Sequence, residues 1–274
     1  RVKNFDKKLI MNIQENWDRI RKSILHTVEM IYRLGFENRT FPAKNAAIPI
    51  IYYVYIKHLE DEVVKTRFLD TKDKNADSQI IKKWLLLVFL KRLFGGQSDS
   101  VLQDIRKVIK ASAAETFPLS EIIAKAKSNP VKNYSFDEDI INGLFEVQFG
   151  SEDAFFVLSL FYPDLDYFNQ NFHIDHIHPK SKFQNKQFMN EHFTDEEIKQ
   201  IGDNWNKLGN LQLLNNEKNI SKQDKSLIEW VKMYKLDSSF LFVDKEISLE
   251  ITDFTTFYAN RVSNMKQKLL EIVR

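Results

Sequence analysis

Residues that break helices are scarce in this chain, and this scarcity limits what the chain can fold into. Its 274 residues include 7 Gly and 6 Pro against 22 Phe. Few breakers and many bulky apolar side chains favour long helices packed on one another, whereas folds built from many tight turns need more glycine and proline. An apolar content of 43% at this length is enough to bury a large core. The sequence therefore predicts a mainly α-helical protein with one large or two smaller domains.

Charge and cysteine content exclude several classes of function. Because 40 Lys and Arg face 38 Asp and Glu, the formal charge of +2 rules out a basic field over the whole surface as the means of attracting nucleic acid. The absence of Cys excludes disulfides, thiol nucleophiles and thiolate-bound zinc. The longest apolar run, residues 84–90, is far shorter than the roughly 20 residues that span a bilayer, so we expect a buried helix and no membrane partner.

Apolar periodicity predicts a helical domain over residues 1–165. Apolar residues recur at steps of three and four from Leu9 to Tyr32, which predicts one long helix with an apolar stripe. Further helices are predicted over residues 49–65, 78–94, 119–127, 137–149 and 153–161, and another begins after Ser100. The chain starts at Arg1 with neither Met nor an apolar signal region, which we interpret as a fragment or a processed chain.

The pattern changes in the second predicted domain, residues 166–274. Residues 171–177 alternate as in a strand, Thr194 begins a helix, and residues 208–214 predict a second strand. One or two helices follow over residues 215–234, and an amphipathic helix closes the chain. The order of strand, insertion, strand and helix predicts a ββα unit.

Polar residues concentrate on the first strand of this predicted unit. His173, His176 and His178 lie within six residues, with Asp175 between them, and Asn219 lies on the helix that packs beside this strand in a ββα unit. Carboxylate and amide oxygens are ligands that Mg²⁺ accepts while it keeps several waters. His176 then remains free to take a proton from an attacking water. One ion and one base suffice for phosphodiester hydrolysis.

Three segments carry a resemblance to a known family. They are Asp175-His176-Ile177-His178-Pro179, then Leu208-Gly209-Asn210-Leu211, then Asn219-Ile220-Ser221-Lys222 followed by Lys225. Together they resemble the HNH (His-Me finger) nuclease motif. The version is similar to that in the C-terminal nuclease region of GmrSD-type modification-dependent restriction proteins. The resemblance covers residues 172–225, and more loosely the helices before them.

The resemblance implies a role for each matching residue. Asp175 and Asn219 would bind one Mg²⁺ or Mn²⁺ ion, and His176 would be the general base. Asn210 would bond the backbone across the loop and help hold the base. Relatives carry an apolar residue at the position of His178, so we interpret His178 as a partly exposed loop residue, with a phosphate contact as the alternative.

Lysines around the motif are candidates for binding DNA. The motif match places Lys222 and Lys225 beside the scissile phosphate, and Lys180 follows the catalytic turn; for a single lysine a solvated surface position is the alternative. Arg261 and other basic residues of the last helix are further candidates for backbone contact. Residues 172–225 hold eight Lys and eight acidic residues, so we expect this module to bind DNA weakly by itself.

The resemblance also implies a biological setting. The expected function is a metal-dependent DNA endonuclease that leaves 5′-phosphate and 3′-hydroxyl ends, in a bacterial cytoplasmic defence system. The expected partners are DNA and an N-terminal nucleotide-hydrolysing sensor domain, which the chain lacks. Two alternatives remain open: a non-catalytic DNA-binding or interaction module on the same scaffold, and a structural zinc site formed by His173, His176 and His178.

Overall fold

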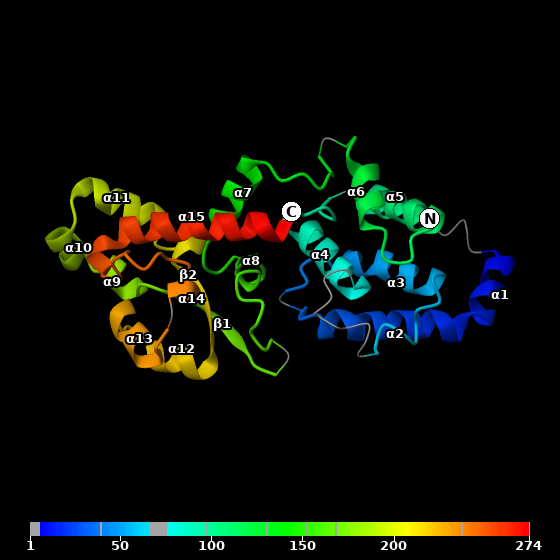
Figure 1. Ribbon diagram of the computed structural model, residues 1–274, viewed down its shortest axis with the longest axis horizontal. Helices are drawn as coiled ribbons and strands as arrows, with labels where there is room; N and C mark the ends of the chain where they lie inside the picture. The colour runs from blue at the N-terminus through cyan, green and yellow to red at the C-terminus, as the bar shows by residue number, and fades with distance from the viewer. Residues whose placement is uncertain are drawn as a thin grey trace. The chain divides into compact units, whose positions relative to one another are not determined.

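Two compact units make up the chain, and most of the residues in both are helical. The computed structural model describes residues 6–38, 40–65, 76–96, 98–129, 131–151, 153–167, 169–236 and 238–273 (Figure 1). The units are Arg1–Ser135 and Phe136–Arg274. Their division falls earlier than the boundary expected at residue 165. The reason is that helices α7 (Glu138–Phe145) and α8 (Ala154–Ser159) pack on the strand region of the second unit.

Helices alone build the described part of the first unit. They are α1 (Lys7–Glu15), α2 (Trp17–Arg33), the 3-10 helix η2 (Lys44–Ala46), α3 (Ala47–Ile56), α4 (Asp77–Leu90), α5 (Ser98–Ala111) and α6 (Leu119–Ala126). The buried helix expected from the apolar run is confirmed as α4, in which Trp84 and Leu85 are fully buried. Nε1 of Trp84 donates a hydrogen bond to the hydroxyl of Tyr134 at 2.9 Å, so this buried indole is satisfied.

The first helix differs from the prediction in two ways. The chain leaves helical geometry at Asn16 (φ −104°, ψ 9°), so the long helix predicted over residues 9–32 is two helices. The apolar stripe also coincides only partly with the buried face, because Trp17 and Val28 are 53% and 55% exposed. Ser23 and Thr27 are buried instead. Helix α2 packs against α3.

The second helix of the prediction is shorter than expected. It begins at Ala47, with Pro49 in its first turn, where proline needs no hydrogen-bond partner for its nitrogen. It ends at Ile56, although the sequence predicted a helix to residue 65. The left-handed backbone of His58 (φ 56°) is incompatible with a continuing helix.

The second unit combines helices with one small sheet. After α7 and α8 its elements are β1 (Phe172–His176), α9 (Lys180–Gln184), α10 (Lys186–His192), α11 (Asp195–Asn204), the 3-10 helix η3 (Leu208–Asn210), β2 (Leu211–Asn215), α12 (Asn216–Lys222), α13 (Leu227–Tyr234), α14 (Ser238–Leu241), the 3-10 helix η4 (Ile251–Asp253) and α15 (Phe254–Val273). Thr194 begins α11 with a capping box closed by Glu197, which explains the helix start predicted there.

The two strands pair in antiparallel fashion and bring the candidate residues to one place. Asp175 lies opposite Gln212, and His176 lies opposite Leu211. The strand predicted over residues 208–214 begins only at residue 211, because η3 precedes it. Helix α12 follows β2 directly and packs against both strands.

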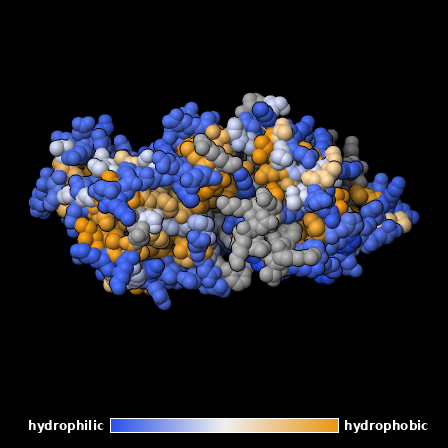
Figure 2. Space-filling view, viewed as in Figure 1, coloured by the Kyte–Doolittle hydropathy of each residue, from blue (hydrophilic) through white to orange (hydrophobic). Residues whose placement is uncertain are grey.

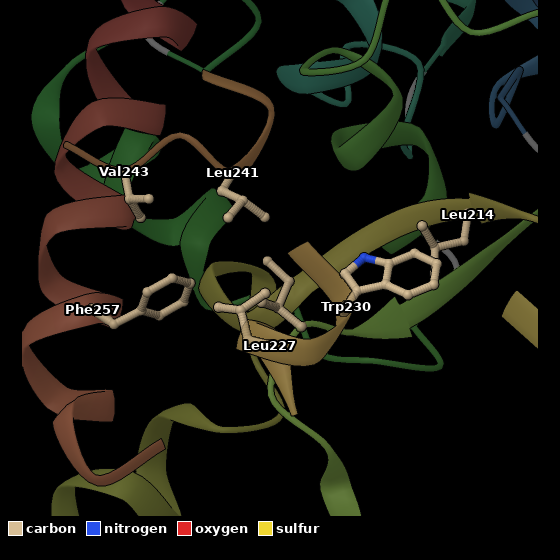
Figure 3. Packing of buried hydrophobic residues seen from close by; sticks show 7 residues of the cluster. Leu214, Leu227, Trp230, Leu241, Val243 and Phe257 are labelled. Atoms are coloured by element: carbon tan, nitrogen blue, oxygen red, sulfur yellow. The ribbon is translucent and has the colours of Figure 1, made fainter. Parts of the chain in front are cut away.

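An apolar core supports the face of the second unit on which β2, α13 and α15 meet. Its buried residues are Ile177, Leu214, Leu227, Trp230, Leu241, Val243 and Phe257. Figure 3 shows Phe257 of α15 pointing toward Leu227 and Leu241, with the indole of Trp230 between Leu227 and Leu214. This core fixes α13 and α15 against the strand that pairs with β1.

Hydrophilic side chains cover much of the face seen in Figure 2, with hydrophobic atoms between them. Within the described ranges, every helix is too short or too polar to cross a bilayer.

Candidate active site

Asp175 makes an ion pair inside the second unit. Its Oδ2 lies 2.8 Å from Nζ of Lys222 and accepts a hydrogen bond from Nε2 of Gln212 at 3.2 Å. The Lys222 ammonium also donates to the carbonyl oxygen of His176 at 2.5 Å. The side chain of Asp175 is 21% exposed, whereas that of Lys222 is 1% exposed. One carboxylate oxygen is therefore held by two donors while the carboxylate keeps access to solvent.

The position of Lys222 corrects an expectation. The motif match placed its ammonium near the helix face beside the scissile phosphate. In the structure the side chain is fully buried on Asp175, so it is not available for direct contact with DNA in this arrangement. The physical reason is that α12 packs flat on β1 and β2, which turns its last residue toward the strands.

Aromatic and amide groups surround the His176 imidazole. The ring of Phe149 lies 4.8 Å from it at 31°, and the ring of Trp205 lies 5.5 Å from it at 29°. Its Nε2 is 3.0 Å from Oδ1 of Asn206. Burial lowers the pKa of His176, and the nearby positive charges of Lys180 and Lys222 add to this shift.

Two opposing effects act on the same imidazole. The hydrogen bond with Asn206 and the negative charge of Asp175 raise the pKa of His176, but burial outweighs them. The lowered pKa keeps the imidazole neutral at physiological pH. A neutral imidazole has one nitrogen with a free lone pair, which is what a general base needs.

Asn210 makes the backbone bonds that the resemblance implies. Its Oδ1 accepts from the N–H of His178 at 2.9 Å, and its Nδ2 donates to the carbonyl oxygens of His178 and Trp205 at 3.2 and 2.8 Å. The side chain is fully buried. Asn210 thus ties the turn after β1 to the end of α11, and its contribution to catalysis stays a prediction.

His178 is neither a partly exposed loop residue nor a phosphate contact in this structure. It is 1% exposed, and the rings of Phe254 and Phe257 meet it edge-on at 5.7 and 4.7 Å. Burial lowers the pKa of His178 to about 3, and the positive charges of Lys222 and Arg261 act in the same direction. Both interpretations failed because helix α15 covers the turn, which the local sequence does not reveal.

The remaining predicted residues lie around this centre. Asn219 is half-buried in α12, and it lies three residues before Lys222, a spacing that puts both on one helix face. Lys225 is half-buried and donates to the carbonyl oxygen of Ser221. Lys180 is exposed, with its ammonium 5.9 Å from the centre of the Trp205 ring.

The three histidines of the zinc alternative have separate environments. His173 is exposed and bonds the side chain of Asn216, His176 meets Asn206, and His178 is enclosed by phenylalanines. Throughout the described residues, no three His, Cys, Asp or Glu side chains gather as a metal site would require. The structure therefore gives no support to the zinc alternative.

Sequence reasoning missed several residues that build the site. Gln212 is fully buried in β2, and a polar residue among Leu211, Leu213 and Leu214 was the signal that it had a specific partner. Asn206 and Phe149 carried no such signal. Their contact with His176 depends on backbone pairing between two distant segments.

Arg261 was expected to be a candidate for contact with the DNA backbone, and the structure corrects this expectation. Arg261 is a buried structural residue. Its guanidinium donates to the carbonyl oxygens of Gly209, Leu211 and Leu241 at 3.1, 2.8 and 2.8 Å, and to the hydroxyl of Tyr162 at 3.3 Å. Its side chain is fully buried. These bonds join α15 to η3, β2 and α14.

Gly209 explains how α15 comes so close to η3. A Cβ atom at this position would lie 2.4 Å from Cε2 of Tyr258 and 2.6 Å from Cγ2 of Val262. The glycine is therefore needed for close approach of the helix, and its φ angle is not in the left-handed region. The Gly-Asn pair of the motif thus has two structural functions: Gly209 admits α15, and Asn210 fixes the turn.

Comparison with known proteins agrees with the resemblance. The family of GmrSD restriction endonucleases, C-terminal domain, matches residues 131–272. The match spans the whole second unit except for its last residues. A search among curated proteins finds no match. The chain belongs to the family of GmrSD restriction endonuclease C-terminal domains, which is a family of nucleases of restriction systems that act on DNA.

Proposed function

We propose that the second unit is an HNH-type, divalent-metal-dependent DNA endonuclease domain with His176 as its general base. The observation that carries the proposal is the juxtaposition of a neutral, buried His176 with the partly exposed Asp175 on one strand. Helix α12, with Asn219, packs alongside. Strands β1 and β2 followed by α12 agree with the ββα order of such nucleases.

The side chains that would act on water and on the phosphate are separate. His176 accepts a proton from the attacking water, because its pKa is lowered and one ring nitrogen is unprotonated at neutral pH. Asn210 keeps the turn after His176 in place through its bonds to His178 and Trp205. The aromatic rings beside the imidazole limit its rotation.

The donor set fits a hydrated Mg²⁺ or Mn²⁺ ion. Asp175 and Asn219 offer hard oxygen ligands, and such ions accept one or two protein ligands with water and substrate oxygens completing the shell. Because the Lys222 ammonium and Gln212 already hold Oδ2 of Asp175, Oδ1 is the carboxylate oxygen that would contact the ion. When bound, the ion would stabilise negative charge on the phosphate and on the leaving oxygen.

DNA contact is assigned to groups at the surface of the site. Exposed Lys180 follows β1, and half-buried Lys225 follows α12, so both side chains border the residues proposed for chemistry. We propose that tight binding and target choice reside in an N-terminal nucleotide-hydrolysing sensor domain of the parent protein. The setting proposed for that protein is defence against modified or foreign DNA in the bacterial cytoplasm.

Plasmid cleavage tests the proposal directly. The chain is incubated with supercoiled plasmid in Mg²⁺, in Mn²⁺ and in EDTA, and plasmids with and without modified cytosine are compared. We expect nicked or linear product only with metal. The variant His176→Ala should lose cleavage by at least about 100-fold, since a positioned general base contributes about 10²–10⁴-fold.

A matched histidine variant controls for folding. His192→Ala changes an exposed histidine of α10 and should retain cleavage. Undiminished cleavage by His176→Ala would refute the proposed base. Tight DNA binding by the wild-type chain without cleavage in either metal would favour the alternative, a non-catalytic DNA-binding module on the same scaffold.

A further inference from the structure

Two segments that are distant in sequence pair beside the candidate base. The N–H of Phe149 donates to the carbonyl oxygen of Asn206 at 2.9 Å, and the N–H of Leu208 donates to the carbonyl oxygen of Val147 at 2.9 Å. Between them Gln148 and Lys207 form an isolated antiparallel bridge. These bonds fix residues 147–149 against residues 206–208, and we call the pair the 147/207 bridge.

An ion pair strengthens this bridge at its edge. Nζ of Lys207 lies 2.6 Å from Oε2 of Glu146, and the Lys207 side chain is only 15% exposed. Helix α7, which ends just before the bridge, packs on η3. The bridge is therefore anchored at both ends to regular structure within the second unit.

The bridge delivers two side chains to His176. The Phe149 ring lies 4.8 Å from the imidazole and is tilted by 31° to it, although the Phe149 side chain is 42% exposed. Asn206 places Oδ1 3.0 Å from Nε2 of His176. Trp205, next to Asn206, adds the second ring at 5.5 Å. Three contacts of the imidazole therefore come from one local structure outside the Asp-His, Gly-Asn and Asn-Lys segments of the motif.

The Asn206 contact determines which ring nitrogen carries the proton. An amide oxygen only accepts hydrogen bonds, so Nε2 of a neutral His176 must be the donor. In a neutral imidazole the other nitrogen, Nδ1, then holds the lone pair. Rotation of the ring about the Cβ–Cγ bond would exchange Nε2 with Cε1 and break the contact with Asn206, and the rings of Phe149 and Trp205 beside the imidazole oppose such rotation.

We infer that Asn206 is a positioning residue that fixes the orientation and tautomer of His176, with Nδ1 as the nitrogen that accepts the proton. Its effect on catalysis rests on the proposed nuclease function, whereas its effect on the imidazole does not. Removal of a partner that orients a metal-bound histidine costs about 10- to 100-fold in activity, and we expect a loss of the same order for a partner that orients a general base. Asn206→Leu should therefore lower kcat by this amount and leave KM within about twofold.

Nitrogen NMR of the whole chain tests the inference without any activity. With ¹⁵N-labelled histidine, long-range ¹H–¹⁵N spectra at neutral pH distinguish the protonated from the unprotonated ring nitrogen, and His176→Gln assigns the signals. We expect a proton on Nε2 of His176, protected from exchange with water. His26 is an internal reference with the opposite pattern, because its Nδ1 contacts the carbonyl oxygen of Glu60.

Three variants complete the test. Asn206→Leu should remove the protected Nε2 proton and give a mixture of tautomers. Asn206→Asp keeps an acceptor oxygen at the same reach, so it should restore the signal. It should also give at least about tenfold higher kcat than Asn206→Leu, assayed at pH 8.5 because the added carboxylate favours protonated imidazole. Asn204→Leu makes the same substitution in the last turn of α11 and should leave the His176 signals unchanged.

The results of these experiments distinguish a failure of the inference about Asn206 from a failure of the proposed nuclease function. A proton on Nδ1 of His176 in the wild-type chain would overturn the inference, as would an unchanged His176 spectrum and kcat in Asn206→Leu. If the Nε2 signature depends on Asn206 but the wild-type chain cleaves no DNA with Mg²⁺ or Mn²⁺, the positioning stands and the nuclease proposal fails.

Discussion

Nζ of Lys222 lies 2.8 Å from Oδ2 of Asp175, and the lysine side chain is almost completely buried. The pair joins the end of α12 to the middle of β1, and the same ammonium bonds the carbonyl oxygen of His176. Charge compensation at Asp175 and the orientation of the strand that carries His176 thus depend on one lysine. Substitutions of Lys222 and Asp175 therefore measure how much this pair contributes to the free energy of unfolding.

Lys222→Met keeps the aliphatic stem and removes the ammonium. We expect a loss of about 2–4 kcal/mol in the free energy of unfolding, because removing one partner of a buried ion pair leaves the other uncompensated. Urea denaturation measures the loss, and a double-mutant cycle with Asp175→Asn isolates the pair. Lys199→Met on the exposed face of α11 is the control and should change stability by less than about 0.5 kcal/mol. Equal losses in the two lysine variants would contradict the prediction.

Gly209→Ala should destabilise the second unit. The added Cβ would lie 2.4 Å from the Tyr258 ring, so α15 or η3 must shift, and such overpacking costs about 1–3 kcal/mol. Gly202→Ala is a matched control, because a Cβ at this exposed position of α11 meets nothing within 4 Å and alanine favours a helix by about 1 kcal/mol. Thermal unfolding of both variants should shift the midpoint in opposite directions. A stable Gly209→Ala protein would show that α15 does not approach η3 this closely.

Arg261→Met should be among the most damaging single changes. It leaves the carbonyl oxygens of Gly209, Leu211 and Leu241 without their donor in a fully buried place, and each unsatisfied group costs about 1–3 kcal/mol. We expect a loss of at least about 3 kcal/mol in denaturation experiments. Lys268→Met removes a half-exposed charge from the same helix and should have little effect. If the two variants unfolded together, the guanidinium would not be buried as described.

Stability should fall at acidic pH because of His178. Its folded pKa of about 3 lies below the ordinary value of 6.5, so between these values the unfolded state binds more protons than the folded state. The stabilising contribution is complete above pH 6.5 and is lost as the pH falls toward 3, at about 1 kcal/mol per pH unit. Lys222 and Arg261 are the charged groups that face the ring, with Phe254 and Phe257 enclosing it.

Urea denaturation at pH 4.5, 5.5 and 7 measures this slope. His178→Leu should reduce the slope of the unfolding free energy against pH by the equivalent of about one bound proton, and His192→Leu is the control substitution at an exposed position. If the slope of stability against pH were unchanged in His178→Leu, the imidazole would be protonated in the folded protein at these pH values. That outcome would contradict the prediction, because burial between two phenylalanines and two nearby cations disfavours a charged ring.

Local sequence patterns predicted where the helices and strands lie better than they predicted which residues of those elements are exposed. The capping box at Thr194 and the apolar run that became α4 were readable, because caps and apolar runs act within one or two turns. The apolar residues Trp17 and Val28 were misleading, since their exposure depends on what else packs against α2. Both effects have the same cause: periodicity selects a helix, but only neighbouring elements decide which of its faces is covered.

In the candidate site, too, local patterns predicted some of the residues, and the packing of distant segments decided the others. Covalent adjacency on a strand fixes Asp175 beside His176, and helical spacing fixes Asn219 on the same face as Lys222, so the motif was recognisable. Gln212 was detectable only as a polar residue among leucines. Phe149 and Asn206 were not detectable, because backbone bonds between segments distant in sequence bring them to the imidazole.

The sequence by itself determined that the chain is mainly helical and that it carries the residues of a restriction nuclease domain, because composition, periodicity and motif spacing are local properties. Only the tertiary structure decided that Lys222 turns inward to Asp175, that His178 and Arg261 are buried, and that Asn206 reaches His176. Each of these depends on helix α15, helix α12 or the 147/207 bridge covering a particular side chain. Burial and hydrogen bonding are set by all the elements that surround a residue, and no local pattern contains that information.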